Sequence, residues 1–515
     1  MLRKIRLTLA TVFLIGLTLL FLDFTGTAHT WLSWMAKVQF LPAVLAINLL
    51  VVVALVVLTL VFGRIYCSII CPLGVMQDLF GWLGKKAKKN RYMYSKEIAW
   101  LRYTMLGLLV IAIIAGIGTI TQLLAPYSAF GRIATMLLQP LWQMGNNVLA
   151  GFAERADSYT FYNVDVWMKS LPVLIIAAIT LVTLAILAWR GGRTYCNTIC
   201  PVGTLLSFLA RFSWLKIQFD SDKCRNCSLC TKNCKASCID FKNHKVDYSR
   251  CVVCGDCLKS CHFGALSYKP YKPHKTNEAN EANETNGSQE PLDSSKRGFL
   301  LSAALVTTAL MAQEQKKAVD GGLAPVKKKV APERQTPITP PGSLSAKNMQ
   351  RRCTGCQLCI SECPNGVLRP STDLMTLMQP VMSYERGYCR PECTRCSEVC
   401  PTGAIQRITK EEKPYIQIGH AVVSKKHCIS ALGEDECGNC MRHCPVEFEV
   451  KDENGEMVKH KAIEMVPSDP NDDLSPLIPA VDERRCIGCG NCEYVCPVRP
   501  LSAIHVEGHL QHKMI

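Results

Sequence analysis

The chain has 515 residues, 49% of them hydrophobic, and a formal net charge of +16 at pH 7. Its length is more than one domain requires. The positive charge does not indicate nucleic-acid binding, because many basic residues flank hydrophobic stretches or lie in linkers, and basic residues beside membrane spans set topology. The 29 cysteines recur in tight quartets, which excludes the disulfide framework of a small secreted protein and indicates metal sites.

Four apolar stretches near the N-terminus approach the length of about 20 residues that crosses a bilayer. They are Ile5–Leu22, Leu41–Phe62, Leu101–Leu124 and Leu171–Trp189. The first has a basic start, like a signal peptide, but no small-residue cleavage site follows it, so we expect it to be retained. Residues 1–215 are therefore predicted to form an α-helical membrane domain with four spans.

Basic residues gather on one side of these spans. They precede span one, separate spans two and three, and follow span four: Arg3, Lys4 and Arg6; Lys85, Lys86, Lys88, Lys89 and Arg91; Arg190 and Arg193. Since basic loops stay in the cytoplasm, the sequence predicts a multi-pass protein of the bacterial inner membrane in which residues 190–297 are cytoplasmic.

The middle of the chain is predicted to contain two linkers on either side of a short apolar run. Residues 271–297 include the polar run TNEANEANETNGSQ and are predicted to be a flexible linker. Residues 298–312 form a short apolar run that resembles a Tat-type export signal; a fifth, short membrane anchor or a surface helix is the alternative. A second linker, residues 313–345, is rich in Lys and Pro. We expect the short run to cross the membrane, which makes residues 346–515 a periplasmic domain.

Residues 216–270 contain two quartets with the spacing C-x2-C-x2-C-x3-C. In two-cluster ferredoxins, three thiolates of one motif and the fourth cysteine of the other bind each [4Fe–4S] cluster. This pattern predicts one cluster on Cys224, Cys227, Cys230 and Cys261, and another on Cys251, Cys254, Cys257 and Cys234. Zinc is the alternative, but zinc sites usually have two separated pairs of ligands.

Two features of these quartets depart from the usual pattern. Lys235 and His262 follow the fourth cysteines, where such ferredoxins have proline. This replacement alters the local turn but removes no ligand. Cys238 is left over, at a position that small apolar residues take in other motifs, so we interpret it as a packed thiol.

The domain of residues 346–515 contains four more quartets, and proline follows the fourth cysteine of each. The quartets are Cys353, Cys356, Cys359, Cys363; Cys389, Cys393, Cys396, Cys400; Cys428, Cys437, Cys440, Cys444; and Cys486, Cys489, Cys492, Cys496. The middle two have a longer first gap. The sequence thus predicts small α+β bacterial-type ferredoxin domains that bind about six [4Fe–4S] clusters in total.

The remaining four cysteines form an internal repeat. Arg64-Ile-Tyr-Cys67-Ser-Ile-Ile-Cys71-Pro follows span two, and Arg193-Thr-Tyr-Cys196-Asn-Thr-Ile-Cys200-Pro follows span four. Each pair at i, i+4 lies on one face of a helix. A redox or metal centre at the membrane surface and a repeated helix-end packing motif are both consistent with this CxxxCP repeat.

Several motifs are absent from the sequence. None of the 11 histidines lies within the four spans, so we expect no bis-histidine haem there. There is no C-x2-C-H, no G-x-G-x-x-G and no P-loop, so neither a c-type haem nor NAD is expected. No residue has the setting of a general acid, base or nucleophile.

These motifs resemble two known families. Residues 1–270 resemble the NapH/MauN-type membrane ferredoxins, and residues 294–505 resemble the NapG/MauM-type four-cluster ferredoxins. The resemblance implies an electron-transfer component of an oxidoreductase complex, which takes electrons from the membrane quinone pool. The implied partner is a periplasmic reductase such as nitrate reductase. A maturation or metal-reducing factor for a metalloenzyme is the alternative function.

The four C-terminal motifs also resemble the four-cluster ferredoxin subunits of bacterial reductases. That resemblance implies that the outer two motifs exchange Cys363 and Cys496, and that the inner two exchange Cys400 and Cys444. Pairing of neighbours in chain order remains open on the sequence alone.

Overall fold

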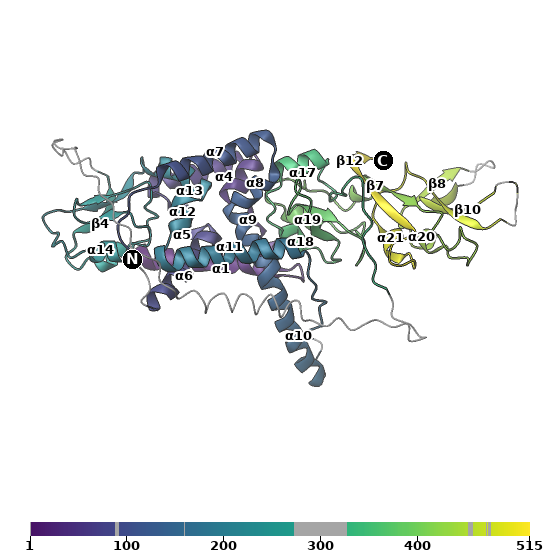
Figure 1. Ribbon diagram of the computed structural model, residues 1–515, viewed down its shortest axis with the longest axis horizontal. Helices are drawn as coiled ribbons and strands as arrows, with labels where there is room; N and C mark the ends of the chain where they lie inside the picture. The colour runs from purple at the N-terminus through teal and green to yellow at the C-terminus, as the bar shows by residue number, and fades with distance from the viewer. Residues whose placement is uncertain are drawn as a thin grey trace.

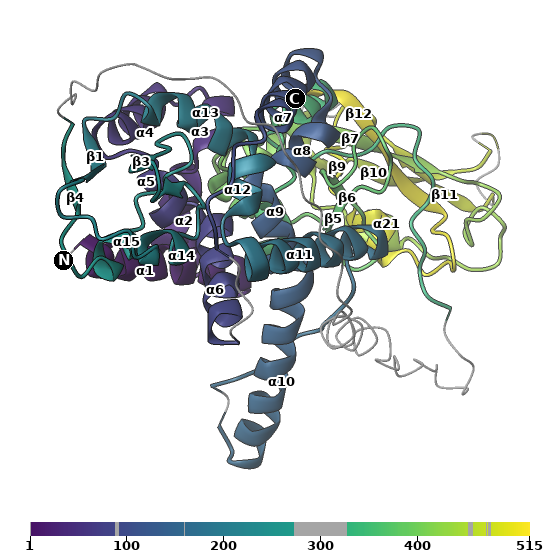
Figure 2. The ribbon, with the colours of Figure 1, turned by 60° about the vertical axis from the view of Figure 1, so that its left-hand side comes forward.

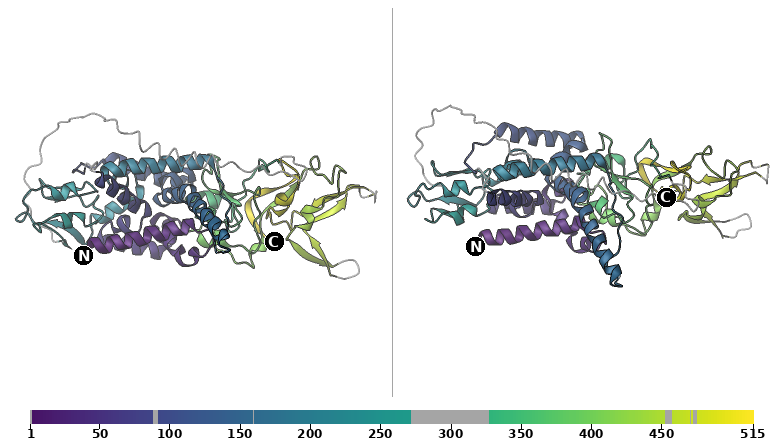
Figure 3. Two further views of the ribbon diagram at one scale, coloured as in Figure 1. Left: turned by 90° about the horizontal axis from the view of Figure 1, so that it is seen from below. Right: turned by 60° about the horizontal axis from the view of Figure 1, so that its bottom comes forward.

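The computed structural model describes residues 2–87, 92–158, 160–271, 327–451, 457–469, 471 and 475–515. The molecule is elongated, with a helical domain between two cysteine-rich regions (Figure 1). Both views of Figure 3 place these regions at opposite ends. Apart from Tyr271, the linker predicted at residues 271–297 and the apolar run at residues 298–312 lie outside the described residues.

The helical domain is built from apolar helices that the two CxxxCP segments interrupt. Its elements are α1 (Leu2–Leu22), α2 (Ala28–Lys37), α3 (Phe40–Leu45), α4 (Leu49–Phe62), α5 (Ile65–Ile69), α6 (Pro72–Lys86), α7 (Ala99–Ala115), α8 (Gly118–Leu124), α9 (Pro126–Ile133), the π-helix η1 (Ala134–Leu138), α10 (Gln139–Arg155), α11 (Leu171–Gly191), α12 (Thr194–Thr198) and α13 (Pro201–Ala210). Figure 2 shows α10 projecting away from the rest.

Two of the four predicted spans are single helices long and apolar enough to cross a membrane. These are α1 and α11, with 21 residues each. The second predicted span divides into α3 and α4, because Ile47 has a φ of 57° and the Asn48 side chain caps α4. The third divides into α7 and α8 at Gly116, a left-handed residue that ends α7. A membrane domain with four spans therefore stays a prediction.

Helix α1 connects the two cysteine-rich regions. Arg3 at its start pairs with Asp256, with 2.7 Å between Nε and Oδ1. Just beyond its end, the carbonyl oxygen of Thr25 accepts a hydrogen bond from Arg395. A helix of 21 residues is about 30 Å long. The two cysteine-rich regions are thus separated by roughly the thickness of a bilayer's hydrocarbon core.

The N-terminal cysteine-rich region is a small α+β unit. It contains β1 (Leu215–Phe219), α14 (Leu229–Lys232), β2 (Ile239–Asp240), β3 (Lys245–Val246), α15 (Asp256–Ser260) and β4 (Leu266–Pro270). Strands β1 and β4 are antiparallel, with Ile217 opposite Tyr268, and they close the unit.

The C-terminal cysteine-rich region has the same kind of elements. They are α17 (Ala346–Arg352), α18 (Leu358–Ser361), β5 (Leu368–Pro370), β6 (Pro380–Met382), α19 (Arg395–Val399), the 3-10 helix η2 (Lys413–Tyr415), β7 (Ile416–Val423), α20 (Asn439–Arg442), β8 (Glu447–Lys451), β9 (Met457–Lys461), β10 (Ile463–Pro467), β11 (Leu477–Val481), α21 (Asn491–Val495) and β12 (Ile504–Met514). The strands pair antiparallel as β5–β6, β7–β12, β8–β9 and β10–β11.

The hydrophobic core is divided between two clusters. The larger runs from the N-terminal ferredoxin unit through the helices, and it includes Cys356 and Cys359 of the C-terminal region. The smaller contains Cys444, Cys486, Cys492 and Cys496. The first two C-terminal motifs thus share a core with the helices, whereas the last two have a core of their own.

The second linker is shorter than the composition predicted. Residues 327–345 pack along the C-terminal domain, where Ile338 is buried and the Lys329 ammonium donates to three backbone carbonyls around Cys496. Arg334 also pairs with Glu493 at 2.6 Å. Lys and Pro disfavour regular elements but do not prevent an extended segment from bonding to a domain, so this domain begins before residue 346.

Candidate iron–sulfur centres

The ferredoxin motifs share one backbone device. A residue with positive φ stands two positions before the third cysteine in five of the six motifs: Ser228, Gly255, Gln357, Gly438 and Gly490. It turns the cysteine loop into a helix of four or five residues that carries the third cysteine. The Cys389 motif, with its longer first gap, has Thr394 there at a φ of −115°.

The N-terminal unit brings its cysteines together in the two predicted groups. Cys224, Cys227, Cys230 and Cys261 line one small cavity. Cys257 faces Cys254, Cys251 and Cys234. The left-over Cys238 is buried, and its Sγ lies 3.5 Å from that of Cys234. It is therefore a packed thiol, as predicted, and it also contacts a ligand of the second cluster.

The C-terminal motifs group differently from the arrangement that the resemblance implied. Four cysteines surround each of four sites: Cys353, Cys356, Cys359 with Cys400; Cys389, Cys393, Cys396 with Cys363; Cys428, Cys437, Cys440 with Cys496; and Cys486, Cys489, Cys492 with Cys444. Motifs exchange their fourth cysteine with neighbours in chain order. The exchange between outer motifs and between inner motifs is thus wrong for this chain, because the first two motifs lie in the larger core and the last two in the smaller one.

The six groups follow one another along the molecule. Cys254 of the second N-terminal group lies beside Lys235, near the helices. Cys356 lies against α9, where a Cβ on Gly131 would be 2.2 Å from the Cys356 carbonyl oxygen. The Cys389 amide donates to the Cys489 carbonyl at 3.0 Å, which joins the two C-terminal pairs. The groups thus form a row with the helical domain in its middle.

The two CxxxCP segments meet inside that domain. Cys67, Cys71, Cys196 and Cys200 are each 4% exposed, and the Cys200 thiol faces the other three. The two segments make the same contact with each other in both directions. Arg64 donates to the carbonyl oxygen of Cys196, and Arg193 donates to that of Cys67. We call these four cysteines the four-thiol site.

The charges around the four-thiol site favour a negatively charged group there. Arg64 is fully buried and, in the described part of the chain, has no carboxylate partner. A buried charge is costly unless an opposite charge compensates for it. The Arg64 guanidinium lies 3.9 Å from the Cys67 sulfur, and the Gln77 amide donates to the Cys196 sulfur at 3.1 Å. Thiolates that bind a metal centre would supply the missing negative charge.

The thiols are not drawn together as closely as a single zinc ion requires. A zinc ion binds sulfur at about 2.3 Å, which brings its thiolates within about 4 Å of one another. Among the described residues, no three cysteine sulfurs lie within 4.8 Å of one another. The four-thiol site shares this wider spacing with the six ferredoxin groups. Its donor set therefore fits an iron–sulfur cluster, which supplies one-electron redox chemistry when bound.

Side chains connect the four-thiol site to both neighbours in the row. Toward the C-terminal domain, Tyr195 interacts electrostatically with Cys200 and Arg132, and Arg132 does so with Cys356. Burial lowers the pKa of Arg132 to about 10. Toward the N-terminal unit, Arg193 pairs with Asp78 at 2.7 Å.

On the side of the four-thiol site toward the N-terminal unit, Asp78 lies at the centre of a cluster of basic side chains. Its carboxylate accepts hydrogen bonds from Arg193, Arg6 and Lys235, each at 2.7 or 2.8 Å. Burial opposes ionisation, but these three cations outweigh it and hold the pKa of Asp78 well below its ordinary value. Lys235 in turn follows Cys234 in the chain and lies beside Cys254.

Sequence reasoning missed the roles of Arg64 and Arg193. Both residues stand three positions before the first cysteine of a CxxxCP motif, so the repeat itself contained the signal. Sequence reasoning also missed the basic side chains beside the ferredoxin cysteine groups. One example is Lys413, which lies beside Cys389 and Cys396. Such cations offset the negative charge of a cluster bound by four thiolates.

Comparisons with known proteins agree with these sites. A family model described as a 4Fe-4S binding domain matches residues 44–91 and 171–219, which contain one CxxxCP motif each. A model described as a 4Fe-4S dicluster domain matches residues 435–500, which supports the pairing of the last two motifs.

Individual proteins are also similar to this chain in sequence. The methylamine utilization ferredoxin-type protein MauM of Methylobacillus flagellatus is 31% identical over 165 residues, 31% of this chain and 64% of the relative. MauM of Paracoccus denitrificans is 30% identical over 34% of this chain and 73% of the relative. MauN of the same organism is 25% identical over 38% of this chain and 57% of the relative. The chain therefore spans about two thirds or less of the length of the first and the last of these relatives.

No solved structure matches the chain. The matches to MauM and MauN nevertheless agree with the cysteine groups that the structure assembles. The chain is similar to MauN, and it belongs to the family of the MauM ferredoxin-type proteins.

Proposed function

We propose that this protein relays electrons across a bacterial inner membrane, from a donor near its N-terminal unit to an acceptor at its C-terminal domain. The observation that carries the proposal is the four-thiol site, which lies between the two sets of ferredoxin groups. A helix of about 30 Å separates these sets, so a centre in the middle divides the distance into shorter steps. About six [4Fe–4S] clusters, and one more at the four-thiol site, would form the row.

The orientation follows from the basic loops of the helical domain. With the N-terminal unit in the cytoplasm, the C-terminal domain at the far end of the helices is periplasmic. A phosphatase reporter fused after Ile515 should be active, since that enzyme folds only after export. An active cytoplasmic reporter at the same site, with an inactive phosphatase, would contradict the orientation and place the acceptor in the cytoplasm.

A cavity beside the N-terminal unit fits the expected quinol donor. Its volume is about 730 Å³, within the range of small-molecule sites, roughly 300–1,000 Å³. Leu7 and Leu14 of α1 and Leu79 and Trp82 of α6 form its apolar wall. Leu7, Leu79 and Trp82 are about half exposed, so the cavity opens at the apolar surface of the helices. A lipid-soluble ring with a long tail could enter there.

The polar end of the cavity contains the two residues that replace the usual prolines. Lys235 and His262 both line it, together with Arg6, Asp78 and Asp256. Each follows the fourth cysteine of its motif, one residue from a predicted ligand. Two departures from the ferredoxin pattern thus meet in one cavity, which explains both of them if the cavity binds the donor.

These residues suit the oxidation of a quinol. The reaction releases two protons and two electrons, and the product is the quinone. Lys235 or Arg6 would donate a hydrogen bond to one ring oxygen, and His262 would accept a proton from the hydroxyl at the other end. The second proton would pass to solvent, to which His262 is exposed. The electrons would pass singly to the centre bound by Cys251, Cys254, Cys257 and Cys234, whose helix α15 borders the cavity.

Replacing His262 by alanine should slow reduction of the clusters by quinol about 100-fold, the usual contribution of a general base. The measurement is anaerobic reduction of the purified full-length protein by a menaquinol or ubiquinol analogue, followed by absorbance. Reduction by dithionite should be unchanged. The control is His244→Ala, which changes a histidine of the same unit that lies against Phe219 outside the cavity. Equal rates for both variants would place the donor elsewhere.

A second function is maturation or metal reduction for a partner enzyme. The names MauM and MauN refer to methylamine utilization rather than to nitrate reduction, so they do not support nitrate reductase as the acceptor. Under it, Cys67→Ser and Cys200→Ser would abolish maturation of the partner while quinol still reduced all the clusters. If the protein is a relay, quinol should no longer reduce the C-terminal clusters in these variants.

A further inference from the structure

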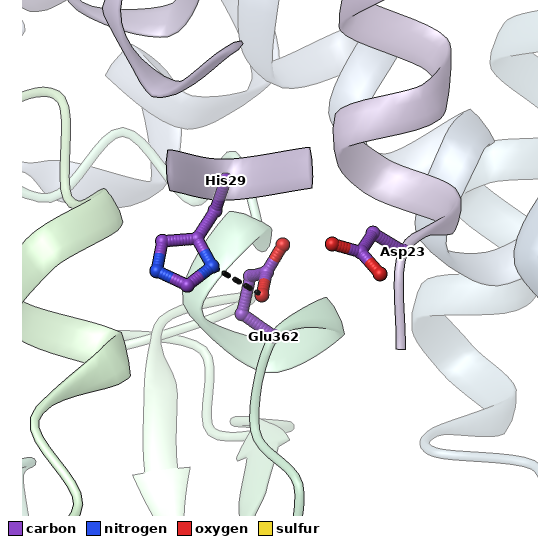
Figure 4. Close-up of side chains that lie close together, drawn as sticks. All are labelled: Asp23, His29 and Glu362. Atoms are coloured by element: carbon purple, nitrogen blue, oxygen red, sulfur yellow. Dashed lines mark ion pairs between the residues drawn. The ribbon is translucent and has the colours of Figure 1, made fainter. Parts of the chain in front are cut away.

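A buried group of acidic residues and a histidine lies where the helical domain meets the C-terminal domain. Asp23 follows α1, His29 belongs to α2, and Glu362 follows α18. One ligand atom of each lies within 4.8 Å of the others. Figure 4 shows the Glu362 carboxylate between the His29 ring and Asp23. The three residues come from both sides of the contact between the two domains.

The polar atoms at the centre of this group form no hydrogen bond with the protein. Glu362 is 2% exposed, and neither of its carboxylate oxygens accepts a hydrogen bond. His29 Nδ1, which points at Glu362 from 3.8 Å, also lacks a hydrogen bond. Buried polar atoms are rarely left unsatisfied, because each costs about 1–3 kcal/mol. Two buried side chains that face each other from beyond hydrogen-bond distance indicate a missing group between them.

The second nitrogen of His29 has the partner that a metal-binding histidine needs. Its Nε2 lies 3.2 Å from Glu398 of α19. A carboxylate that accepts the proton of one ring nitrogen leaves the other with a free lone pair and fixes the orientation of the ring. Glu398 is itself fixed, since Thr394 donates to its other oxygen at 2.5 Å.

Carboxylates outnumber the ion-paired cations around this group. Three carboxylates face this group, from Asp23, Glu362 and Glu398, and the cations that act on them are Arg395 and Arg407. In the described part of the chain, no Lys or Arg forms an ion pair with any of the three. Asp23 remains available even though Thr25, Gly26 and Ala28 donate to it, because carboxylate oxygens accept more than one partner.

We propose that Asp23, His29 and Glu362 bind a divalent first-row transition cation that fastens the C-terminal domain to the helical domain. Imidazole with carboxylates is a donor set for such cations. The positive charge of the cation would offset the carboxylates that face the group. The cation also holds α18, which carries Cys359 and leads to Cys363, against the end of α1. It thereby fixes the spacing between the four-thiol site and the first C-terminal centre.

The test uses the full-length protein, purified anaerobically in detergent, treated with EDTA, reloaded with Zn²⁺ and desalted. Elemental analysis should find about one zinc ion per chain beside the iron. X-ray absorption at the zinc edge should show nitrogen and oxygen ligands without sulfur, which separates this site from zinc in a cysteine group. A protein that retains no zinc, or zinc with sulfur ligands only, would overturn the proposal.

Two variants locate the ion. His29→Ala and Glu362→Gln should each lose the zinc and keep the iron content of the parent, which also reports correct folding. The matched control is His460→Ala, because His460 and Glu464 form a histidine–carboxylate pair at 2.7 Å on the exposed surface. It should keep the zinc. Zinc that persists with nitrogen and oxygen ligands in His29→Ala would assign it to other residues.

Discussion

Replacing Cys200 by serine should stop electron transfer between the two ends of the molecule. In the parent, a quinol analogue is expected to reduce the N-terminal and then the C-terminal centres. In Cys200→Ser, only the N-terminal centres should be reduced, with the C-terminal rate lowered at least about 100-fold. Electron paramagnetic resonance of samples frozen during the reaction would measure the two sets. The physical reason is distance, since about 30 Å of helix lies between the ends.

The same variant also tests what the four-thiol site binds. If the site holds a [4Fe–4S] cluster, Cys200→Ser should lose about four iron atoms per chain. Arg64 would then be left buried without a negative partner, and Arg64→Met should rescue part of the lost stability of the variant. Retention of all the iron would show that the four thiols pack without a metal.

A buried cysteine outside every group provides the control. Cys238 is 1% exposed and lies beside Cys234 without belonging to a quartet. Cys238→Ser should keep the iron content and the transfer between the two ends. Equal transfer in Cys200→Ser and Cys238→Ser would sink the relay through the four-thiol site.

The sequence predicts well those features that short segments determine. Three ligands of each N-terminal cluster lie within seven residues, so the spacing alone assigns Cys224, Cys227 and Cys230 to one loop. The CxxxCP repeat likewise predicts two thiols on one helix face. It does not predict that the faces of two repeats meet, because the contact depends on how α6 and α11 pack.

The spacing of cysteines along the chain does not predict features that depend on tertiary packing. Which motif receives Cys400 or Cys496 depends on which motifs share a core. The site of Asp23, His29 and Glu362 joins residues more than 300 positions apart, and no local pattern marks it. Hydropathy also overlooked the breaks at Asn48 and Gly116, since one polar or small residue hardly changes the average over a span.

Asparagine in place of Asp78 should destabilise the helical domain by about 3–5 kcal/mol, the cost of leaving buried cations without their partner. Arg193, Arg6 and Lys235 all bond to this one carboxylate, which is 12% exposed. The isosteric amide keeps the shape and removes the charge. Thermal unfolding of the detergent-solubilised protein, followed by iron–sulfur absorbance, measures the effect. Asp220→Asn, which breaks the exposed pair with Lys223, should produce no change.

The pH dependence of this difference follows from the sign of the shift. The pKa of Asp78 is lower in the folded protein than its unfolded value of about 3.9. The folded state therefore holds fewer protons on this group, and the stabilisation is present above the unfolded pKa and lost as the pH falls toward the folded one. The difference between the parent and Asp78→Asn should stay constant from roughly pH 5 to 8 and shrink below about pH 4. A difference that grew on acidification would mean that Asp78 is protonated in the folded state, and that the three cations are neutralised by another group.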